Sequence, residues 1–369
     1  MTGRSEVEEI RAAYGIVGRV HEIERAFAAL RSSRHLLIEG PVGVGKTVLA
    51  LAVARHLGRP VFRVDGDERY TEQKLAGWFD PPVVLEKGYV PEAFVAGPLT
   101  EAMRKGGILF VNEMNRMPEG VQNILLPAMD EGMIEVPKVG VVRAAPGFVV
   151  IATQNPREFV ATTAISEALS DRFELLILAY QDEAEETQIV SKHLPQAPQE
   201  LVGRAVWIAR RTRDHPNIRR GASVRAAMSI VRLAPQLSSD QTDGIRKASH
   251  MALPTRIELR EESQAKADEI IDQIVDECLS ITPPELHAVE QRRERERRDE
   301  ARGARKEKNV DVGDIATIVD ANLPSYLVDS GDIGITVAQN YALLRPYLTN
   351  PATLEMAKRL KLGPNPVGM

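Results

Sequence analysis

Short apolar runs alternate with amphipathic helical patterns over the first half of the chain. Five of these runs are predicted to be strands, at residues 34–39, 60–64, 108–113, 148–153 and 175–178. Segments between them place apolar residues three and four positions apart, which is the helical period. Strands that alternate with helices are typical of a parallel sheet covered by helices on both faces. The pattern therefore predicts an α/β fold for this part of the chain.

Two further pairs of short apolar segments are predicted to be β-hairpins inserted into this alternation. Their strands are residues 83–90 with 93–95, around a turn at Gly88, and residues 133–136 with 141–143. A helix at residues 71–79 is expected just before the first hairpin. Because glycine turns separate segments of this length, each pair is interpreted as a two-stranded insert.

From Asp182 onwards the helical period continues without strands. Helices are predicted at residues 183–193, 200–212, 223–233, 242–251 and 259–279. The last of these carries Ile270, Ile274 and Cys278 on one side, as a single amphipathic helix would. This part of the chain is predicted to be a small all-helical domain.

A run of charged residues follows at 290–308. It holds nine basic and six acidic residues, a balance of 9 − 6 = +3, and no aromatic residue. Such a composition supports nucleic-acid contact only weakly, and we favour a solvated helix or a flexible connector. The tail from Val310 regains apolar residues, and we expect it to be ordered.

The composition narrows the class of protein. Of the 369 residues 43% are hydrophobic and 27% are charged, which is ordinary for a globular protein. The net charge of −5 argues against nucleic-acid binding through bulk positive charge. A single cysteine, Cys278, excludes an intramolecular disulfide and a zinc site built of cysteines. No apolar run reaches the roughly 20 residues of a membrane span, and the charged N-terminus is unlike a signal peptide. We expect a cytoplasmic protein.

Residues 40–47 carry the strongest chemical signal. They are Gly40, Pro41, Val42, Gly43, Val44, Gly45, Lys46 and Thr47, which have the spacing of a P-loop. Glycines let backbone N–H groups point at phosphate oxygens, the lysine reaches the β- and γ-phosphates, and the threonine hydroxyl ligates Mg²⁺. A strand before the motif and a helix after it disfavour the alternative, a glycine turn without a ligand. ATP and Mg²⁺ are the predicted cofactors.

Two strand ends are predicted to complete this site. The strand at 108–113 ends in Asn112 and Glu113, and we expect it beside the P-loop strand. Asn112 would then face Mg²⁺, and Glu113 would polarise the attacking water as a general base. Asn155, after the strand at 148–153, is predicted to hold the same water, with formation of the turn before Pro156 as the alternative.

Two other places give weaker signals. Arg225 lies in the first turn of a helix that Ser223 is expected to cap, where a cation opposes the helix dipole unless a phosphate is near. A solvent-exposed arginine is the alternative. Val17 and Gly18 lie in a break between helical segments within residues 5–31. They are predicted to contact an adenine, and an ordinary packing role is the alternative.

Several motifs together make the chain similar to the AAA+ superfamily, and specifically to MoxR-type ATPases of its magnesium-chelatase-like branch. The likeness covers about residues 10–260. It rests on GPVGVGKT at 40–47, GPL at 97–99, ILFVNEMNR at 108–116, VQNILLPAMDEG at 121–132, IATQNP at 151–156, SDRF at 170–173 and GASVR at 221–225. The two predicted hairpins match the inserts of that family.

The resemblance implies roles for individual residues. Lys46 and Thr47 would bind ATP and Mg²⁺, Glu113 would be the Walker B base, and Asn155 the sensor 1 residue. Arg172 resembles an arginine finger that acts on a neighbouring subunit, and Arg225 resembles the sensor 2 residue of the lid. Members of the family form hexameric rings and often act with a von Willebrand A-domain protein to remodel or metallate a client.

The same resemblance suggests how the chain is divided. Residues 1–180 would be an AAA+ nucleotide-binding domain, and residues 181–284 a helical lid with the amphipathic helix. Residues 285–369 would be a charged helix or linker and a helical C-terminal extension. The predicted fold is thus a P-loop AAA+ core with a parallel sheet and two hairpin inserts, followed by these helical parts.

Asn112 departs from the family pattern, in which aspartate is usual. Hydrogen bonds to charged groups contribute about 1.5–3 kcal/mol against about 0.5–1.5 kcal/mol for neutral ones, so we expect Mg²⁺ binding to be weaker by something like tenfold. The favoured function is an ATP-hydrolysing remodelling or metal-insertion ring with a client or von Willebrand A-domain partner. A nucleotide-gated scaffold with little hydrolysis and a DNA-acting motor are the alternatives.

Overall fold

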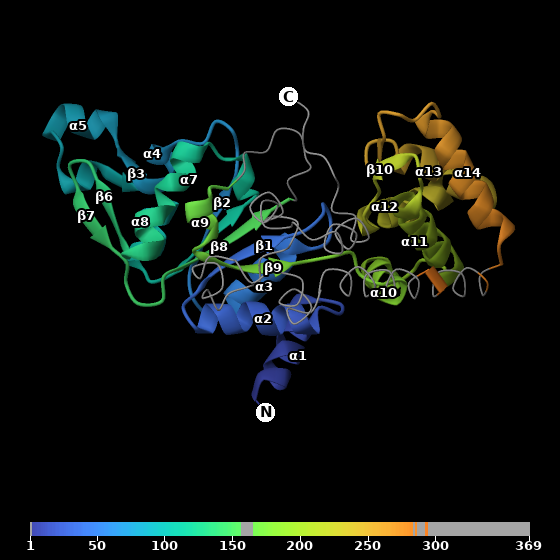
Figure 1. Ribbon diagram of the computed structural model, residues 1–369, viewed down its shortest axis with the longest axis horizontal. Helices are drawn as coiled ribbons and strands as arrows, with labels where there is room; N and C mark the ends of the chain where they lie inside the picture. The colour runs from blue at the N-terminus through green and yellow to red at the C-terminus, as the bar shows by residue number, and fades with distance from the viewer. Residues whose placement is uncertain (1, 156–164, 283–284, 286–291, 294–369) are drawn as a thin grey trace, which may run out of the picture. The chain divides into compact units, whose positions relative to one another are not determined.

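The computed structural model describes residues 2–155, 165–282, 285 and 292–293 (Figure 1). The predictions for Pro156, for most of the charged run and for the tail lie outside the described residues. Within the described residues, no helix combines the length and the apolar character needed to cross a membrane.

A parallel five-stranded sheet is the centre of the α/β part. Its strands are β1 (His35–Glu39), β2 (Val61–Asp65), β5 (Ile108–Asn112), β8 (Val149–Gln154) and β9 (Phe173–Ile177), in the spatial order β2-β5-β8-β1-β9. All five predicted strands are therefore present. One expectation was wrong, since β8 lies between β5 and the P-loop strand β1. Periodicity places strands along the chain, but their neighbours in the sheet depend on the crossover connections.

Each face of the sheet has its own apolar core, because successive strand residues point to opposite faces. One core includes Leu36, Ile38 and Phe110. Its helices are α1 (Thr2–Tyr14), α2 (Val20–Arg31) and α3 (Lys46–His56). The other core includes Leu37 and Val111. Its helices are α4 (Glu72–Ala76), α6 (Pro98–Arg104), α7 (Glu119–Asn123), α8 (Leu125–Asp130) and α9 (Glu167–Ser170). Figure 1 shows α2 and α3 together on one side of the sheet.

Both inserts are two-stranded, but the first one differs from its prediction. The pairs are β3 (Gly77–Phe79) with β4 (Phe94–Ala96), and β6 (Met133–Val136) with β7 (Gly140–Arg143). The segment predicted as a strand at 83–90 is mostly helix α5 (Pro81–Lys87), and a 3₁₀ turn η1 (Pro91–Ala93) follows.

Local signals outweigh the apolar pattern in that segment. Pro81 lies at the first position of α5, where its fixed φ suits a helix, and Gly88 ends the helix with φ 77°. Earlier in the insert, Gly77 ends α4 with φ 133°, so the helix expected over 71–79 stops there and β3 begins. None of the α5 residues is buried, so no packing favours a strand for its valines.

The remaining described residues are mainly helical. The helices are α10 (Glu183–His193), α11 (Gln199–Asp214), α12 (Val224–Leu237), α13 (Gln241–Ala252) and α14 (Ala267–Ser280). They enclose a separate apolar core that includes Trp207 and Ile230. The predicted apolar side of the last helix is buried, and burial raises the pKa of the Cys278 thiol to about 12.

Two details of this helical part differ from the prediction. The helix expected from residue 259 begins at Ala267, where the Glu269 carboxylate accepts from the Lys266 N–H at 3.2 Å. In addition, β10 (Ile218–Arg220) pairs with β11 (Glu258–Leu259), so this part is not purely helical.

Candidate nucleotide-binding site

The P-loop connects the carboxyl end of β1 to the start of α3. Gly43 and Gly45 have φ of 83° and 93°, in the left-handed region that glycine adopts without strain. Helix α3 begins at Lys46, directly after Gly45. A glycine loop that leads into a helix N-terminus presents N–H groups and a positive dipole end to an anion. Residues 40–47 therefore have the backbone conformation and the helix N-terminus that a phosphate-binding loop needs.

Lys46 is buried and bound within this loop. Its Nζ donates to the Gly40 carbonyl at 2.6 Å, to the Pro41 carbonyl at 2.9 Å and to Asn155 Oδ1 at 2.9 Å. Burial lowers the pKa of Lys46 to about 8, and the positive field of Arg225 acts in the same direction. The opposing charge of Glu113 raises it. The structure thus brings the predicted site residues Lys46 and Asn155 into contact.

Thr47 is bound to the end of strand β5. Its hydroxyl donates to Asn112 Oδ1 at 2.9 Å, and the Thr153 hydroxyl donates to the same oxygen at 3.1 Å. The Asn112 amide donates in turn to Asp65 Oδ1 at 2.9 Å. Oxygen atoms of this kind suit Mg²⁺, which prefers hard oxygen ligands. No group of three or more His, Cys, Asp or Glu side chains arranged to hold a metal occurs in the described part of the chain.

Glu113 follows β5 in an unusual backbone conformation, with φ 54° and ψ 49°. Its N–H donates to Thr153 Oγ1 at 2.9 Å, which holds the turn against β8. Its carboxylate accepts from Arg116 Nη1 at 3.0 Å, in the 3₁₀ turn η2 (Met114–Arg116). A non-glycine residue with positive φ marks a position that the surrounding structure must stabilise, and such positions cluster at functional sites.

The N-terminus of α12 lies against the P-loop. A Cβ atom on Gly43 would be 2.3 Å from the Ser223 hydroxyl oxygen, so the two segments are in direct contact. Ser223 occupies the N-cap position of α12, but its side chain makes no capping hydrogen bond, contrary to the prediction. Arg225 is in the first turn of this helix, where its field reaches Lys46.

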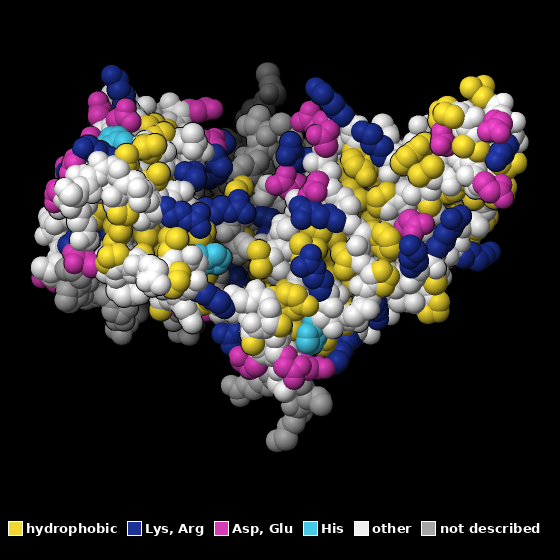
Figure 2. Space-filling model, turned by 180° about the vertical axis from the view of Figure 1, so that it is seen from behind, with side chains coloured by type: hydrophobic (Ala, Val, Ile, Leu, Met, Phe, Trp, Pro, Cys, Tyr) yellow, Lys and Arg dark blue, Asp and Glu magenta, His cyan; other side chains and the backbone are white. Residues whose placement is uncertain are grey.

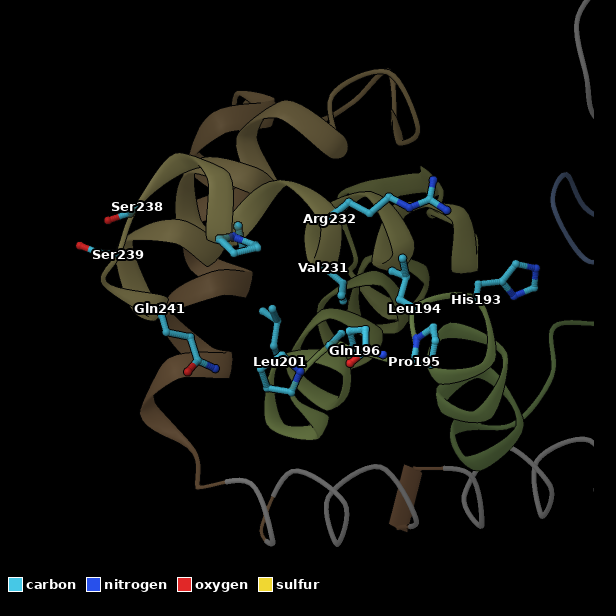
Figure 3. Close-up of a pocket in the computed structure, with 14 residues that line it drawn as sticks. His193, Leu194, Pro195, Gln196, Leu201, Val231, Arg232, Ser238, Ser239 and Gln241 are labelled. Carbon is cyan, nitrogen blue, oxygen red and sulfur yellow. The ribbon is translucent and has the colours of Figure 1, made fainter.

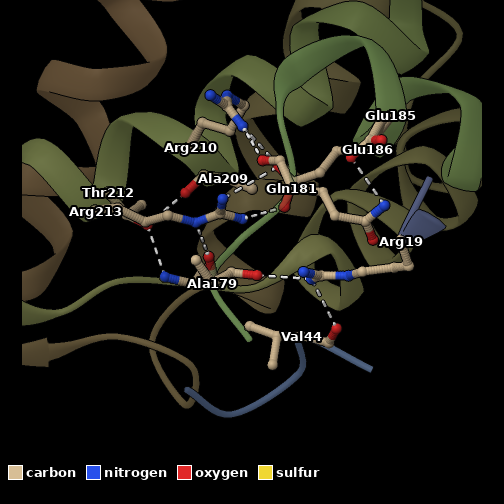
Figure 4. Close-up of polar contacts among 11 residues, drawn as sticks. Arg19, Val44, Ala179, Gln181, Glu185, Glu186, Ala209, Arg210, Thr212 and Arg213 are labelled. Carbon is tan, nitrogen blue, oxygen red and sulfur yellow. Dashed lines mark hydrogen bonds and ion pairs between the residues drawn. The ribbon is translucent and has the colours of Figure 1, made fainter. Parts of the chain in front are cut away.

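Val17 and Gly18 are also close to the nucleotide loop. The Val17 carbonyl accepts from Gln181 Nε2 at 2.8 Å. Next to them, the buried Arg19 donates to the Val44 carbonyl at 3.2 Å and to the Ala179 carbonyl at 2.6 Å (Figure 4). The sequence analysis missed Arg19, and no pattern in the sequence indicates it. It also missed Asp65, whose signal is an acid at a strand end on the same sheet edge as the P-loop.

In the single chain, Arg172 contacts residues away from the P-loop. Its Nε donates to Asp130 Oδ1 at 2.6 Å, and a second nitrogen donates to the Ala168 carbonyl. This ion pair raises the pKa of Arg172. Among the described contacts, Arg172 therefore has partners on α8 and α9 rather than in the P-loop.

A separate hollow of about 590 Å³ lies in the helical part (Figure 3). Leu194, Leu201 and Val231 line it, with His193 and Arg232 also on its wall. None of its lining residues belongs to the P-loop or to the strand ends described above. This hollow is therefore separate from the candidate nucleotide site at the P-loop.

Side chains of both charges occur together on the surface. Figure 2 shows basic, acidic and apolar side chains mixed on one face of the molecule. The net charge of −5 likewise offers no excess of positive charge to a phosphate backbone.

Comparisons with known proteins identify the family to which this part of the chain belongs. Residues 35–173 match a family model described as an AAA domain of the dynein-related subfamily. The gas vesicle ATPase GvpN2 of Halobacterium salinarum is 30% identical over 282 residues, which cover 72% of this chain and 80% of that protein. The gas vesicle ATPase GvpN of Haloferax mediterranei is 33% identical over 214 residues, which cover 53% of this chain and 61% of that protein.

Among solved structures, the Holliday junction branch migration motor RuvB of Thermotoga maritima aligns with a TM-score of 0.42 at 17% identity. The alignment covers 64% of this chain and 70% of that one, and the likeness is too low to bear on function.

The matched AAA domain contains the whole P-loop, both strand ends and Arg172. The relatives are ATPases, and the chain is an ATP-hydrolysing P-loop enzyme that binds nucleotide. The chain therefore belongs to the AAA+ ATPases of MoxR-like type, in one family with the gas vesicle ATPase GvpN2.

Proposed function

We propose that this ATPase works as a ring that remodels or assembles a partner protein in the cytoplasm. Support comes from one arrangement, the convergence of Lys46, Thr47, Asn112, Glu113 and Asn155 at one edge of the sheet. Lys46 and Thr47 begin α3 after the P-loop, whereas Asn112, Glu113 and Asn155 lie at or just beyond the ends of β5 and β8. In a P-loop enzyme, side chains at these positions bind the nucleotide, bind the metal and act on the attacking water.

Each residue of the set has a chemical task in this proposal. The Thr47 hydroxyl would ligate Mg²⁺, which when bound neutralises charge on the phosphates, and the Asn112 amide oxygen would accept the Thr47 proton as an outer-shell contact. Lys46 binds the phosphates themselves. Glu113 accepts a proton from the attacking water after its carboxylate leaves Arg116, and Asn155 orients that water. Arg225 adds positive charge from the helical side.

The proposed assembly is a homo-oligomer, with six subunits as in rings of this type. Arg172 would leave Asp130 and act on the nucleotide of the neighbouring subunit. In this scheme residues 1–180 are the nucleotide-binding domain, residues 181–284 are the lid, and residues 285–369 are an extension available to partners.

The partner is proposed to be a protein client, with or without a von Willebrand A-domain protein as adaptor. Chaperone-like remodelling and metal insertion are both compatible with such a ring. The names of the relatives add a specific candidate, since both relatives named above are gas vesicle ATPases. A protein of a gas vesicle is therefore the first client to test.

The proposal is tested with Lys46→Ala and Glu113→Gln. Lys46 contacts phosphates already in the ground state, whereas Glu113 acts on the water, so the first variant should lose ATP binding and the second only turnover. Binding is measured with a fluorescent ATP analogue and turnover by phosphate release. Glu119→Gln, at the start of α7, is the matched control and should keep both activities. Normal turnover of Glu113→Gln would reject Glu113 as the base.

The partner is identified with the same variant. Because Glu113→Gln should hold ATP without hydrolysing it, a client that binds the ATP state accumulates on it. Crosslinking in cells and mass spectrometry, compared with Lys46→Ala, would identify the client. Equal recovery on both variants would contradict an ATP-dependent client.

A further inference from the structure

Asp65 places a carboxylate next to Asn112, which stands where aspartate is usual in the family. It is the last residue of β2, and it lies directly opposite Asn112 in the parallel pairing of β2 with β5. Its Oδ1 accepts from Asn112 Nδ2 at 2.9 Å. A carboxylate is therefore present beside this position of the site, one strand further from the P-loop.

The contact determines how the Asn112 amide is oriented. A carboxylate only accepts hydrogen bonds, so the amide nitrogen must face Asp65 and the amide oxygen must face the other way. That oxygen accepts from the hydroxyls of Thr47 and Thr153. The opposite orientation would put two oxygens in contact at Asp65 and is disfavoured.

The orientation of the amide decides what the Thr47 hydroxyl can do. As arranged, Thr47 donates its proton to Asn112, and both lone pairs of its oxygen stay available for a cation. A rotated amide would donate its N–H to the Thr47 oxygen and occupy one of those lone pairs. An aspartate at position 112 would offer an acceptor in either rotamer, so only asparagine needs this control.

Arg63 holds Asp65 in place. Its Nη2 donates to Asp65 Oδ1 at 2.7 Å, and its Nε lies 3.0 Å from Oδ2. The two residues are two positions apart on β2 and so share one side of the strand. Since the guanidinium offsets the negative charge of Asp65, the effect on a metal comes from geometry more than from added charge.

We propose that Asp65 is a positioning residue for Mg²⁺: it fixes the Asn112 amide so that the Thr47 oxygen stays free for the cation. The inference rests on the proposed function, because it requires a metal–nucleotide complex at Thr47. It concerns binding, so it is measured without turnover.

The test is a titration of the purified full chain with Mn²⁺ in the presence of ADP, followed by electron paramagnetic resonance of free Mn²⁺. Asp65→Ala should weaken Mn²⁺ binding about tenfold, as loss of a partner outside the metal ligands commonly does. Asp65→Asn should bind nearly as the parent, because one amide oxygen can accept from both Arg63 and Asn112. Asp67→Asn is the matched control; it removes a nearby acid that accepts from the Arg69 N–H instead, and it should change nothing.

Repeating the Asp65→Ala measurement in an Asn112→Asp variant shows whether Asp65 orients the Asn112 amide or only stabilises the protein. In Asn112→Asp no amide needs to be oriented, so adding Asp65→Ala there should cost little Mn²⁺ affinity. Parent-like binding by Asp65→Ala, or an equal loss in both backgrounds, would overturn the inference. Thr47→Ala is the reference for the metal site. If it binds Mn²⁺ as the parent does, the proposed metal site itself is wrong; if it fails while Asp65→Ala binds normally, only the role of Asp65 is rejected.

Discussion

Lys46 shows how burial tunes a single residue of the site. Only 8% of this residue is exposed, and its ammonium group is bound by two loop carbonyls and by Asn155. Removal from water disfavours the charged form, which lowers the pKa of Lys46 from 10.5 to about 8. The cation that must bind phosphate therefore loses its proton within an experimentally accessible range.

This shift predicts a pH dependence of ATP binding. Below pH 8 the Lys46 amine is charged and binds phosphate, and above pH 8 it must first take up a proton. ATP affinity should therefore fall as pH rises above 8, by at most about tenfold per pH unit. Calorimetric titrations in buffers of different ionisation enthalpy should detect proton uptake near pH 8–9. Lys46→Arg stays charged and should lose both effects; an unchanged slope in that variant would assign them to another group.

At the scale of elements, α10 and α11 are joined by a buried ion-pair cluster. Glu186 of α10 is 3% exposed and accepts from Arg213 Nη2 at 2.9 Å and from Arg210 Nη1 at 3.3 Å, both on α11. The same arginines hold the segment that leads from β9 into α10. Arg210 donates to the Gln181 carbonyl at 2.8 Å (Figure 4). The Arg213 guanidinium lies 3.9 Å from the Tyr180 ring centroid.

Breaking this cluster should destabilise the helical part strongly. Glu186→Gln removes the buried negative charge that Arg210 and Arg213 share, and breaking a buried ion pair commonly costs about 3–5 kcal/mol. Urea unfolding in a Trp78→Phe background, in which Trp207 of the helical core is the one tryptophan left, measures the loss by fluorescence. The exposed pair of Lys247 with Asp243 is the control, and Asp243→Asn should leave the midpoint nearly unchanged. Equal midpoints for both variants would show that the buried cluster adds no stability.

At the scale of the whole molecule, Arg172 has two possible roles: it can stabilise the fold of the single chain, or it can act on a neighbouring subunit of a ring. In the single chain it pairs with Asp130 at the end of α8. The proposed ring requires it to release this partner and to stabilise charge on the γ-phosphate of a neighbour. Fingers of this kind contribute about 10³–10⁵ in rate.

If the ring proposal is correct, ATPase activity should rise more steeply than linearly with protein concentration. Arg172→Ala should bind ATP but not turn it over. Mixing it with Glu113→Gln should recover activity, because some interfaces then combine an intact Glu113 with an intact Arg172. Asp130→Asn tests the alternative that the Arg172–Asp130 pair only supports the fold. In that case Arg172→Ala and Asp130→Asn both melt early, and the mixture of Arg172→Ala with Glu113→Gln stays inactive. A well-folded Arg172→Ala with normal turnover would reject the finger.

The sequence by itself determined the features that depend on neighbours along the chain. The strands of the sheet, the P-loop and the buried side of α14 follow from apolar period and motif spacing, which are local properties. The same reasoning failed at residues 83–90, where valines suggested a strand. There Pro81 and Gly88 delimit a helix whose residues are all at least partly exposed. An apolar pattern indicates that a segment is buried, but the α5 residues of this segment are not buried in the structure.

Only the tertiary structure decided which distant residues meet. The placement of β8 between β5 and β1 depends on crossovers, and no local pattern encodes it. The contact of Asp65 with Asn112 follows from the pairing of β2 with β5, and that of Gly43 with Ser223 from the packing of α12. Such contacts arise from the summed packing of whole elements. Motifs could therefore identify the ATPase, whereas the neighbours that adjust its metal site became visible only in the fold.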